Sequence, residues 1–311
     1  MSDPRLLLFL ALGVIGLSFV IAWGRALVKR RAAAGAVAGP AAPTALQAGI
    51  GFLTNFFDTL GIGSYAPTTA LFRFFKLVPD ERIPGTMTLG HTLPTVVQAF
   101  IFIAIVQVSF PTLVTLIAAS MVGAWLGAGV VAAWPRRKIQ VGMGIALTVA
   151  ALLFVLKNLD EMRGAPALPG GQALGLSGGL LLLALGGNFV LGALMTLGIG
   201  LYAPCLIMIS LLGMEPRVAF PIMMGSCAFL MPVASVRFLK AQAYEARPAL
   251  GLALGGVPAV LIAALIVKAL PLVYVRWLVV VVVLYAAIGL LKDGRTEGRK
   301  DRRLTDGRTE G

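Results

Sequence analysis

The sequence predicts an all-α polytopic membrane protein, with an N-terminal helix and two inverted repeats that each hold a re-entrant broken-helix hairpin and three transmembrane helices. Of the 311 residues, 59% are hydrophobic and only 13% are charged, whereas soluble domains carry about 25% charged residues. Apolar runs of about 20 residues, enough to cross a bilayer, recur along the chain. The phrase TLGIGSYAP at 59–67 returns as TLGIGLYAP at 196–204, with a single difference.

The first element is an apolar stretch at 6–28, followed by Lys-Arg-Arg at 29–31. A cleavable signal peptide carries its charge before the apolar run, and here only Arg5 precedes it. We therefore expect a retained helix with its N-terminus outside the cell and its basic end in the cytoplasm. Together with a linker rich in Ala, Gly and Pro, this helix forms an N-terminal unit over residues 1–43.

The two transporter repeats are expected at 44–157 and 173–291, with an external loop at 158–172 between them. Within the repeats, long apolar runs predict full crossings of the bilayer. These runs are 86–107, 111–133, 138–157, 218–238, 249–270 and 272–291.

Each repeat opens with a segment that is too long for one simple crossing, at 44–77 in the first and 173–213 in the second. The TLGIG phrase interrupts both segments. Each glycine costs a helix about 1 kcal/mol relative to alanine. The proline that closes each phrase is well suited to the first turn of a new helix. Each segment is therefore expected to form a helix, an unwound glycine turn and a second helix.

Charge placement predicts that these segments return to their own side. If 44–77 crossed once, the basic cluster at 134–138 would lie outside, against the preference of basic loops for the cytoplasm. With hairpins, the basic residues gather inside, namely Arg73, Lys76, Arg82, Arg136, Arg137, Lys138, Arg237, Lys240 and Arg247. Each repeat then has an odd number of crossings, so the two repeats face opposite ways, as in many transporters.

Residues 292–311 differ in composition from the rest of the chain. DGRTEG occurs at 293–298 and again at 306–311, with charges of both signs and few apolar residues. Such a composition cannot bury a core, so we expect a charged, disordered cytoplasmic tail. The chain as a whole is expected to be a multi-pass protein of the inner (plasma) membrane.

The formal net charge of +13 is typical of nucleic-acid binding when it is spread over one surface. Here the basic residues form short clusters between apolar spans, as positive-inside orientation produces, so no nucleic acid is expected as a partner. The single His and the two cysteines, Cys205 and Cys227, show neither metal-site spacing nor a disulfide framework. With no nucleophile constellation either, we expect no metal, no cofactor and no enzymatic activity.

The two unwound turns are the predicted binding site, because non-helical backbone at membrane depth is tolerated only when it is buried in protein or lines a polar cavity. Free amides and helix N-termini at both turns favour an anion. The residues expected to bind it are Gly61, Gly63, Ser64, Tyr65, Gly198, Gly200, Leu201 and Tyr202. The tyrosine hydroxyls could hydrogen-bond an oxyanion, with aromatic packing as the alternative. The alternative for the glycines is that they only allow close helix packing.

Three further side chains in the apolar spans could add polar chemistry. Asp58 is an ionisable residue at membrane depth, which suggests either proton coupling or capping of the broken helix. His91 could face the pathway and donate to the anion or carry a proton, or it could be a satisfied packing residue. Ser226 follows a glycine as His91 does, so it is the matching candidate in the second repeat.

The stretches GFLTNFFDTLGIGSYAP at 51–67 and ERIPGTMTLGHT at 81–92 resemble the sulfite exporter TauE/SafE family of membrane transporters. That family's pattern is an Asp shortly before a glycine run, then a Pro, then a Gly-Thr that opens the next helix. The residues in those places are Asp58, Gly61, Gly63, Pro67, Gly85 and Thr86. The resemblance covers roughly 44–291. It implies export of sulfite or organosulfonates and adds Thr86 to the substrate-binding residues.

The chain departs from the family pattern in two places: its glycine run is thinned to Gly-Ile-Gly-Ser, and Met195 stands where the repeat alignment places Asp58. The predicted function is a secondary transporter that exports small sulfur-containing anions by alternating access. The alternative is an anion channel that uses the same hairpins as a pore. Its partners would be the small anion and the lipid bilayer, while a homodimer and proton coupling stay open.

Overall fold

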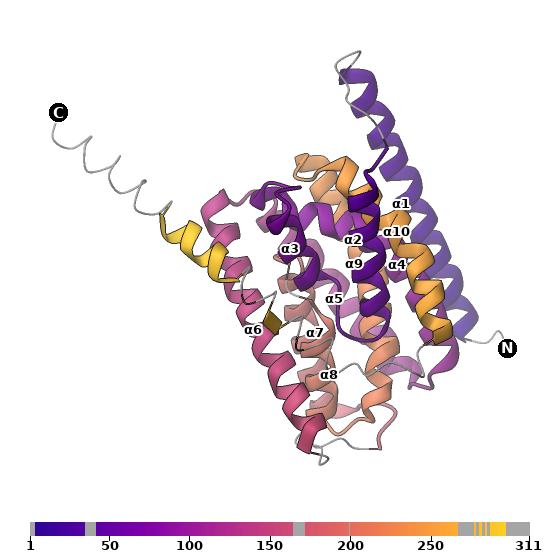
Figure 1. Ribbon diagram of the computed structural model, residues 1–311. Coiled ribbons are helices and arrows are strands. Elements are labelled where there is room, and N and C mark those ends of the chain that lie inside the picture. Colours follow the sequence, from indigo (N-terminus) through magenta and orange to yellow (C-terminus); the bar gives the residue numbers. More distant parts are fainter. Residues whose placement is uncertain are drawn as a thin grey trace, which may run out of the picture.

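The computed structural model describes residues 4–34, 42–163, 172–198, 200–266, 277, 280–281, 284 and 287–296. Over these residues the chain is helical and contains no β-strand (Figure 1). The helices are α1 (Pro4–Ala34), α2 (Ala45–Thr59), α3 (Tyr65–Phe74), α4 (Ile83–Ile105), α5 (Phe110–Val131), α6 (Arg136–Arg163), α7 (Gly178–Met195), α8 (Tyr202–Leu211), α9 (Ala219–Ala241) and α10 (Ala246–Ile266). Short 3₁₀ turns at Asp80–Arg82 and Pro216–Val218 precede α4 and α9.

Six helical stretches in the described part of the chain are long and apolar enough to cross a membrane. They are Arg5–Ala32, Asp80–Ile105, Phe110–Val131, Gly178–Met195, Ala219–Ala241 and Ala246–Leu265. The prediction of an all-α, multi-pass membrane protein is confirmed at this level. The crossing expected at 272–291 lies largely outside the described residues.

Helix α6 runs past its predicted boundary. It continues to Arg163, whereas an external loop was expected from 158 onward. The stretch 158–163 reads Asn-Leu-Asp-Glu-Met-Arg, and Leu, Glu, Met and Arg are all good helix formers. The polar stretch therefore extends the helix beyond the expected boundary at 157.

The C-terminal helix also continues further than expected. Residues 287–296 are helical, so the part of the tail from Lys292 to Thr296 is ordered. The Asp293 carboxylate forms an ion pair with Arg73 of α3, at 2.6 Å, which ties this helix to the first hairpin. Residues 297–311, where the rest of the predicted tail falls, lie outside the described residues.

Helix α2 begins with a capping box. The Thr44 hydroxyl accepts the backbone N–H of Gln47 (3.2 Å), and the Gln47 side-chain oxygen accepts the backbone N–H of Thr44 (2.9 Å). Two amides that have no partner inside the helix are satisfied in this way. The start of the first broken segment is therefore fixed by its own sequence.

The α2–α3 segment begins and ends at the same end of the bundle. Before α2, the Ala42 carbonyl accepts a hydrogen bond from Nε of Arg247 at the start of α10, at 2.8 Å. After α3, Arg82 forms an ion pair with Glu245, which directly precedes α10. Arg30, at the end of α1, lies beside the same glutamate. We call this end of the bundle the basic end.

The α7–α8 segment begins and ends at the opposite end. Ala173, before α7, donates its N–H to the Gly213 carbonyl (3.4 Å) and accepts the N–H of Glu215 (3.0 Å), both of which follow α8. The Leu174 carbonyl accepts the N–H of Ser109, in the α4–α5 connection, at 2.8 Å. Because α4 runs from the basic end to this connection, the two broken segments enter the bundle from opposite ends.

Helices α4 and α9 pack against each other at the centre of the bundle, and both are buried along most of their length (Figure 1). Helix α4 also packs against α10, and α9 packs against α5. The first arm of each broken segment packs across the two halves of the chain, with α2 against α10 and α7 against α5. Exchanging α2 with α7, α4 with α9 and α5 with α10 therefore reproduces the same set of contacts.

Glycines allow these crossed pairs to approach backbone to backbone. In the α5–α7 pair, Gly123 lies directly against the Phe189 carbonyl, and in the α2–α10 pair Gly255 lies against the Ala48 carbonyl. A Cβ atom at either glycine would overlap the opposite main chain. Close contact through small residues is the usual way in which membrane helices associate.

We predict that Gly123→Ala destabilises the protein by about 1 to 3 kcal/mol, because the added methyl group forces α5 and α7 apart. Gly186→Ala on α7 is the matched control, since no atom lies within 4 Å of the position its Cβ would take. Thermal unfolding of the detergent-purified variants measures the difference. Equal midpoints for the two alanine variants would contradict the close-packing argument.

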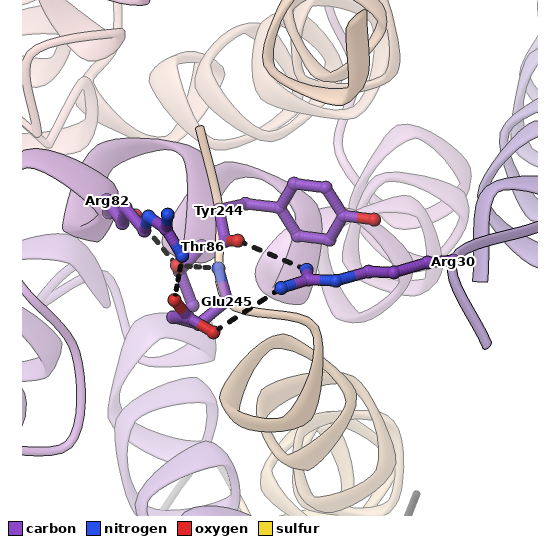
Figure 2. Close-up of polar contacts among 5 residues, drawn as sticks. All are labelled: Arg30, Arg82, Thr86, Tyr244 and Glu245. Atoms are coloured by element: carbon purple, nitrogen blue, oxygen red, sulfur yellow. Dashed lines mark hydrogen bonds and ion pairs between the residues drawn. The ribbon is translucent and has the colours of Figure 1, made fainter. Parts of the chain in front are cut away.

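A polar cluster at the basic end joins α1, α4 and the α9–α10 connection (Figure 2). The Glu245 carboxylate pairs with Arg82 and lies 3.9 Å from the Arg30 guanidinium. The Thr86 hydroxyl donates to the Arg82 carbonyl (2.7 Å) and accepts the Glu245 N–H (2.9 Å). Arg30 donates to the Tyr244 carbonyl (3.5 Å), and burial raises the pKa of the Tyr244 phenol, which keeps it neutral.

We predict that Glu245→Gln lowers stability by about 1 to 2 kcal/mol, because two guanidinium groups lose a charged acceptor in a partly buried site. Glu215→Gln is the control, since its pair with Arg217 has 3.8 Å separation and an 85% exposed arginine side chain. Exposed pairs of this kind contribute about 0 to 1 kcal/mol. Thermal unfolding at low and high salt should separate the two variants, and an equal loss in both would count against the cluster.

Candidate substrate site

The backbone leaves helical geometry at both copies of the repeated phrase. Helix α2 ends at Thr59 and α3 begins at Tyr65, while α7 ends at Met195 and α8 begins at Tyr202. In the first turn Gly61 and Gly63 have φ values of +84° and +88°, and in the second turn Gly198 has a φ of +93°. Side chains with a Cβ rarely adopt this left-handed conformation. The glycines are therefore required by the turns themselves.

The two turns meet at one small buried cavity. Its walls are formed by Asp58, Gly63, Ser64, Tyr65, Thr95, Met195, Gly200, Leu201, Tyr202 and Cys227. The cavity volume is about 10 Å³, the room that one water molecule needs. Seven of the residues singled out from the sequence are thus brought together, from segments far apart in the chain.

Gln98 of α4 connects the two turns through its side-chain amide. Its Nε2 donates to the Asp58 carboxylate and to the Thr59 hydroxyl, both at 2.9 Å. Its Oε1 accepts the hydroxyl of Tyr202, at 2.8 Å. All of these side chains are buried. One residue on a central helix therefore holds the last turn of α2 and the first turn of α8 together.

The Asp58 carboxyl has further partners inside the first turn. The hydroxyl and the backbone amide of Ser64, which precedes α3, both interact with it. An amide predicted to bind the substrate is therefore occupied by the protein's own carboxyl in this conformation. This is the capping arrangement, in which an acidic side chain accepts an amide at a helix N-terminus.

Two of the predicted glycines lie beside the cavity without lining it. Gly61 faces the ring of Phe220, and Gly198 faces the side chains of Met87 and Met143. Both support the turns through their backbone conformation. Tyr65, which does line the cavity, directs its hydroxyl to Thr88 at 3.3 Å.

His91 lies next to the cavity wall and is fully buried. Its Nε2 is 3.0 Å from the Thr68 hydroxyl, and its Nδ1 is 3.0 Å from the side-chain oxygen of Asn55. Its ring lies 5.8 Å from that of Tyr65. Both ring nitrogens have protein partners, and the side chain is not part of the cavity lining. This arrangement favours the second of the two roles considered for His91, a packing residue whose hydrogen bonds are satisfied by the protein.

The other two predicted residues also lie away from the cavity. Thr86 belongs to the polar cluster at the basic end (Figure 2). Ser226 accepts a hydrogen bond from Asn188 of α7, at 2.9 Å. The pair Asn188–Ser226 joins α7 to α9 as Asn55–His91 joins α2 to α4, so the match of Ser226 with His91 extends to their asparagine partners.

Sequence reasoning did not single out Gln98, Thr95, Asn55 or Asn188. All four are polar side chains within apolar stretches and are fully or almost fully buried. An amide inside a membrane helix must find partners there, and a search for Asn and Gln in the apolar spans would have found three of them.

The cavity wall combines hydroxyls and one carboxyl with apolar side chains. Asp58 is its one carboxylic acid, and no Lys, Arg or His is among the lining residues. In the described part of the chain there is no cluster of His, Cys, Asp or Glu that could hold a metal ion. The arrangement offers hydroxyls, helix N-termini and one carboxyl, which suit reversible binding of a small polar ion.

Comparison with known proteins gives no relative: no family model, no curated protein and no solved structure matches this chain.

We predict that His91→Leu costs about 1 to 3 kcal/mol of stability, because the Thr68 hydroxyl and the Asn55 oxygen lose a buried partner. Met143→Leu, a change of similar volume at a fully buried position, is the control and should cost less than about 1.5 kcal/mol. Thermal unfolding in detergent measures both. If His91→Leu is no more harmful than Met143→Leu, the hydrogen bonds of His91 contribute nothing to stability.

Proposed function

We propose that the protein is a secondary membrane transporter that exports small sulfur-containing anions, of the sulfite or organosulfonate class, by alternating access. The observation that carries this proposal is the meeting of two glycine-broken segments at one small cavity that contains the Asp58 carboxyl and the N-termini of α3 and α8. Transporters with repeated halves bind their substrates where broken helices meet, near the middle of the bilayer.

The contacts between helices support an inverted repeat. The set of contacts is unchanged when the two halves are exchanged, and the broken segments enter from opposite ends. Each central helix also carries an interior proline, Pro94 in α4 and Pro232 in α9. Two re-entrant hairpins, one per repeat, are the arrangement that these features favour.

An anion is the favoured ligand class because α3 and α8 direct their N-termini at the cavity. Ser64 and Tyr65 contribute from α3, and Leu201 and Tyr202 contribute from α8. Helix N-termini carry a partial positive charge and free amides. The resemblance of residues 44–291 to sulfite exporters narrows the anion to sulfur oxyanions and sulfonates.

Basic side chains at one end of the bundle support the direction of transport. Arg30, Arg82 and Arg247 gather there, and basic ends lie in the cytoplasm. A cleft of about 400 Å³ at this end is lined by Arg73 and Lys76 together with Asp80 and Asp293, and its two basic side chains could collect anions before export. Arg73 is also paired with Asp80 and Asp293.

A channel is less well supported than a carrier. The cavity is the size of one water molecule and its walls are buried side chains, so among the described residues the space where the two turns meet has no room for a larger ion in this conformation. A carrier passes through such a closed state in every cycle, whereas a channel needs an open path for conduction.

The test is uptake into liposomes that contain the purified protein, with sulfite, methanesulfonate, sulfoacetate, taurine and sulfate as the probes. We expect saturable uptake of at least one of them, reduced about 10-fold or more in Tyr202→Phe, because a hydrogen bond to a charged group contributes roughly 1.5 to 3 kcal/mol. Tyr244→Phe is the matched control, as this buried tyrosine belongs to the basic end.

Uptake by Tyr244→Phe should stay within about 2-fold of the wild-type rate. Absence of saturable uptake for all five probes, with a folded wild-type protein, would overturn the transport proposal. Uptake that rises linearly with concentration at channel-like rates would favour the pore instead.

A further inference from the structure

The position of Asp58 in the structure disfavours the ionised form of its carboxyl group. It lies in the last turn of α2, where the helix dipole disfavours negative charge, and it is 3% exposed. The ionisable groups that face it are the phenols of Tyr65 on α3 and Tyr202 on α8, and the thiol of Cys227 on α9. None of these is a cation. Its charge is therefore balanced by hydrogen bonds alone.

The remaining elements around the carboxyl contribute neutral groups. Helix α4 supplies Thr95 to the cavity wall and the Gln98 amide, and α7 supplies Met195. The Gln98 and Ser64 groups that contact the carboxyl are hydrogen-bond donors. A metal cation would need several oxygen acceptors around it, whereas a proton needs only the carboxyl. The chemistry of this site thus favours a proton as the cation that neutralises Asp58.

A substrate anion and an ionised Asp58 exclude each other. Both would share one cavity of about 10 Å³ in its closed form, so their charges would lie a few ångströms apart in surroundings of low dielectric. An anion therefore enters most favourably when Asp58 is protonated. When the cavity is empty, the ionised carboxyl takes the place of the anion beside the amide of Ser64.

The Gln98 amide couples the protonation state of Asp58 to Tyr202 in the second hairpin. It donates to the carboxylate and accepts from Tyr202, and the Tyr202 hydroxyl also interacts with the carboxylate directly. In the ionised state this hydroxyl is therefore held by both groups. A neutral carboxyl is a weaker acceptor. Protonation therefore loosens this chain and makes the hydroxyl available to an anion.

We infer that Asp58 is the proton-coupling residue, taking up one proton for each anion that binds and releasing it on the opposite side with the anion. Transport of a monoanion would then be electroneutral proton–anion symport, and it would run outward when the cytoplasmic excess of the anion outweighs the pH gradient. In the balanced step, the carboxylate and one proton form the neutral carboxyl, and no other group changes its charge. This inference rests on the proposed transport function and adds the coupling ion to it.

The test uses methanesulfonate, which stays a monoanion at any pH near neutrality, in proteoliposomes with valinomycin and potassium to set the membrane potential. For the wild type, an acidic exterior by one pH unit should drive about 10-fold accumulation, since one pH unit corresponds to a factor of ten. A potential of about 60 mV, positive inside, should leave accumulation unchanged.

Asp58→Asn keeps the size of the side chain and removes the titration. It should show the reverse behaviour: no accumulation from the pH gradient, and about 10-fold accumulation from the same potential of about 60 mV. Glu215→Gln is the control, because Glu215 is an acid that lines neither the cavity nor the cleft of Arg73 and Lys76, and its pair with Arg217 is exposed. This variant should keep the wild-type response.

The outcomes separate the two proposals. If the wild type carries neither methanesulfonate nor sulfite, the transport function fails and the coupling inference fails with it. If the wild type carries methanesulfonate and responds to potential but not to pH, only the coupling inference fails. A response of Asp58→Asn to pH that equals that of the wild type would overturn the role of Asp58 and leave transport standing. An inactive but folded Asp58→Asn, with normal Glu215→Gln, would overturn the prediction that a neutral residue suffices.

Discussion

Unpaired main-chain polar groups cannot face hydrocarbon, and the architecture of this protein depends on that constraint. The chain interrupts two helices at apolar depth, and each interruption leaves amides and carbonyls without helical partners. They are sheltered at the centre, between α4 and α9, where the two turns meet. The turns are therefore buried together, and at least the Ser64 amide of the first turn finds its partner there, in the Asp58 carboxyl.

The crossed pairing of helices explains how this centre is held together. The first arm of each broken segment packs against a helix of the other half, α2 against α10 and α7 against α5, through glycine contacts that bring backbones together. The pairs α2–α10 and α5–α7 are thus compact units, whereas the two turns are linked by side-chain hydrogen bonds among Asp58, Gln98 and Tyr202.

The sequence was informative where local chemistry decides the structure. Hydropathy predicted the helical membrane fold, and the glycine phrase predicted the places where α2 and α7 end. The sequence was less informative about which neighbouring helix each buried polar side chain faces. Helix α4 is buried nearly all round, so no polar face indicated that His91 would bind Asn55 and that Gln98, two turns further on, would reach Asp58. That choice depends on how helices from both halves are rotated against one another.

The position of Cys227 gives the molecule a built-in reporter of its own opening. Its thiol lies in the wall of the cavity and is 1% exposed, while Cys205, the other cysteine, is equally buried but is not part of that wall. In the closed form a water-borne thiol reagent has no route to either sulfur. Any conformation that exposes the cavity to water also exposes the Cys227 thiol. The rate at which Cys227 is alkylated would therefore measure how often the cavity opens.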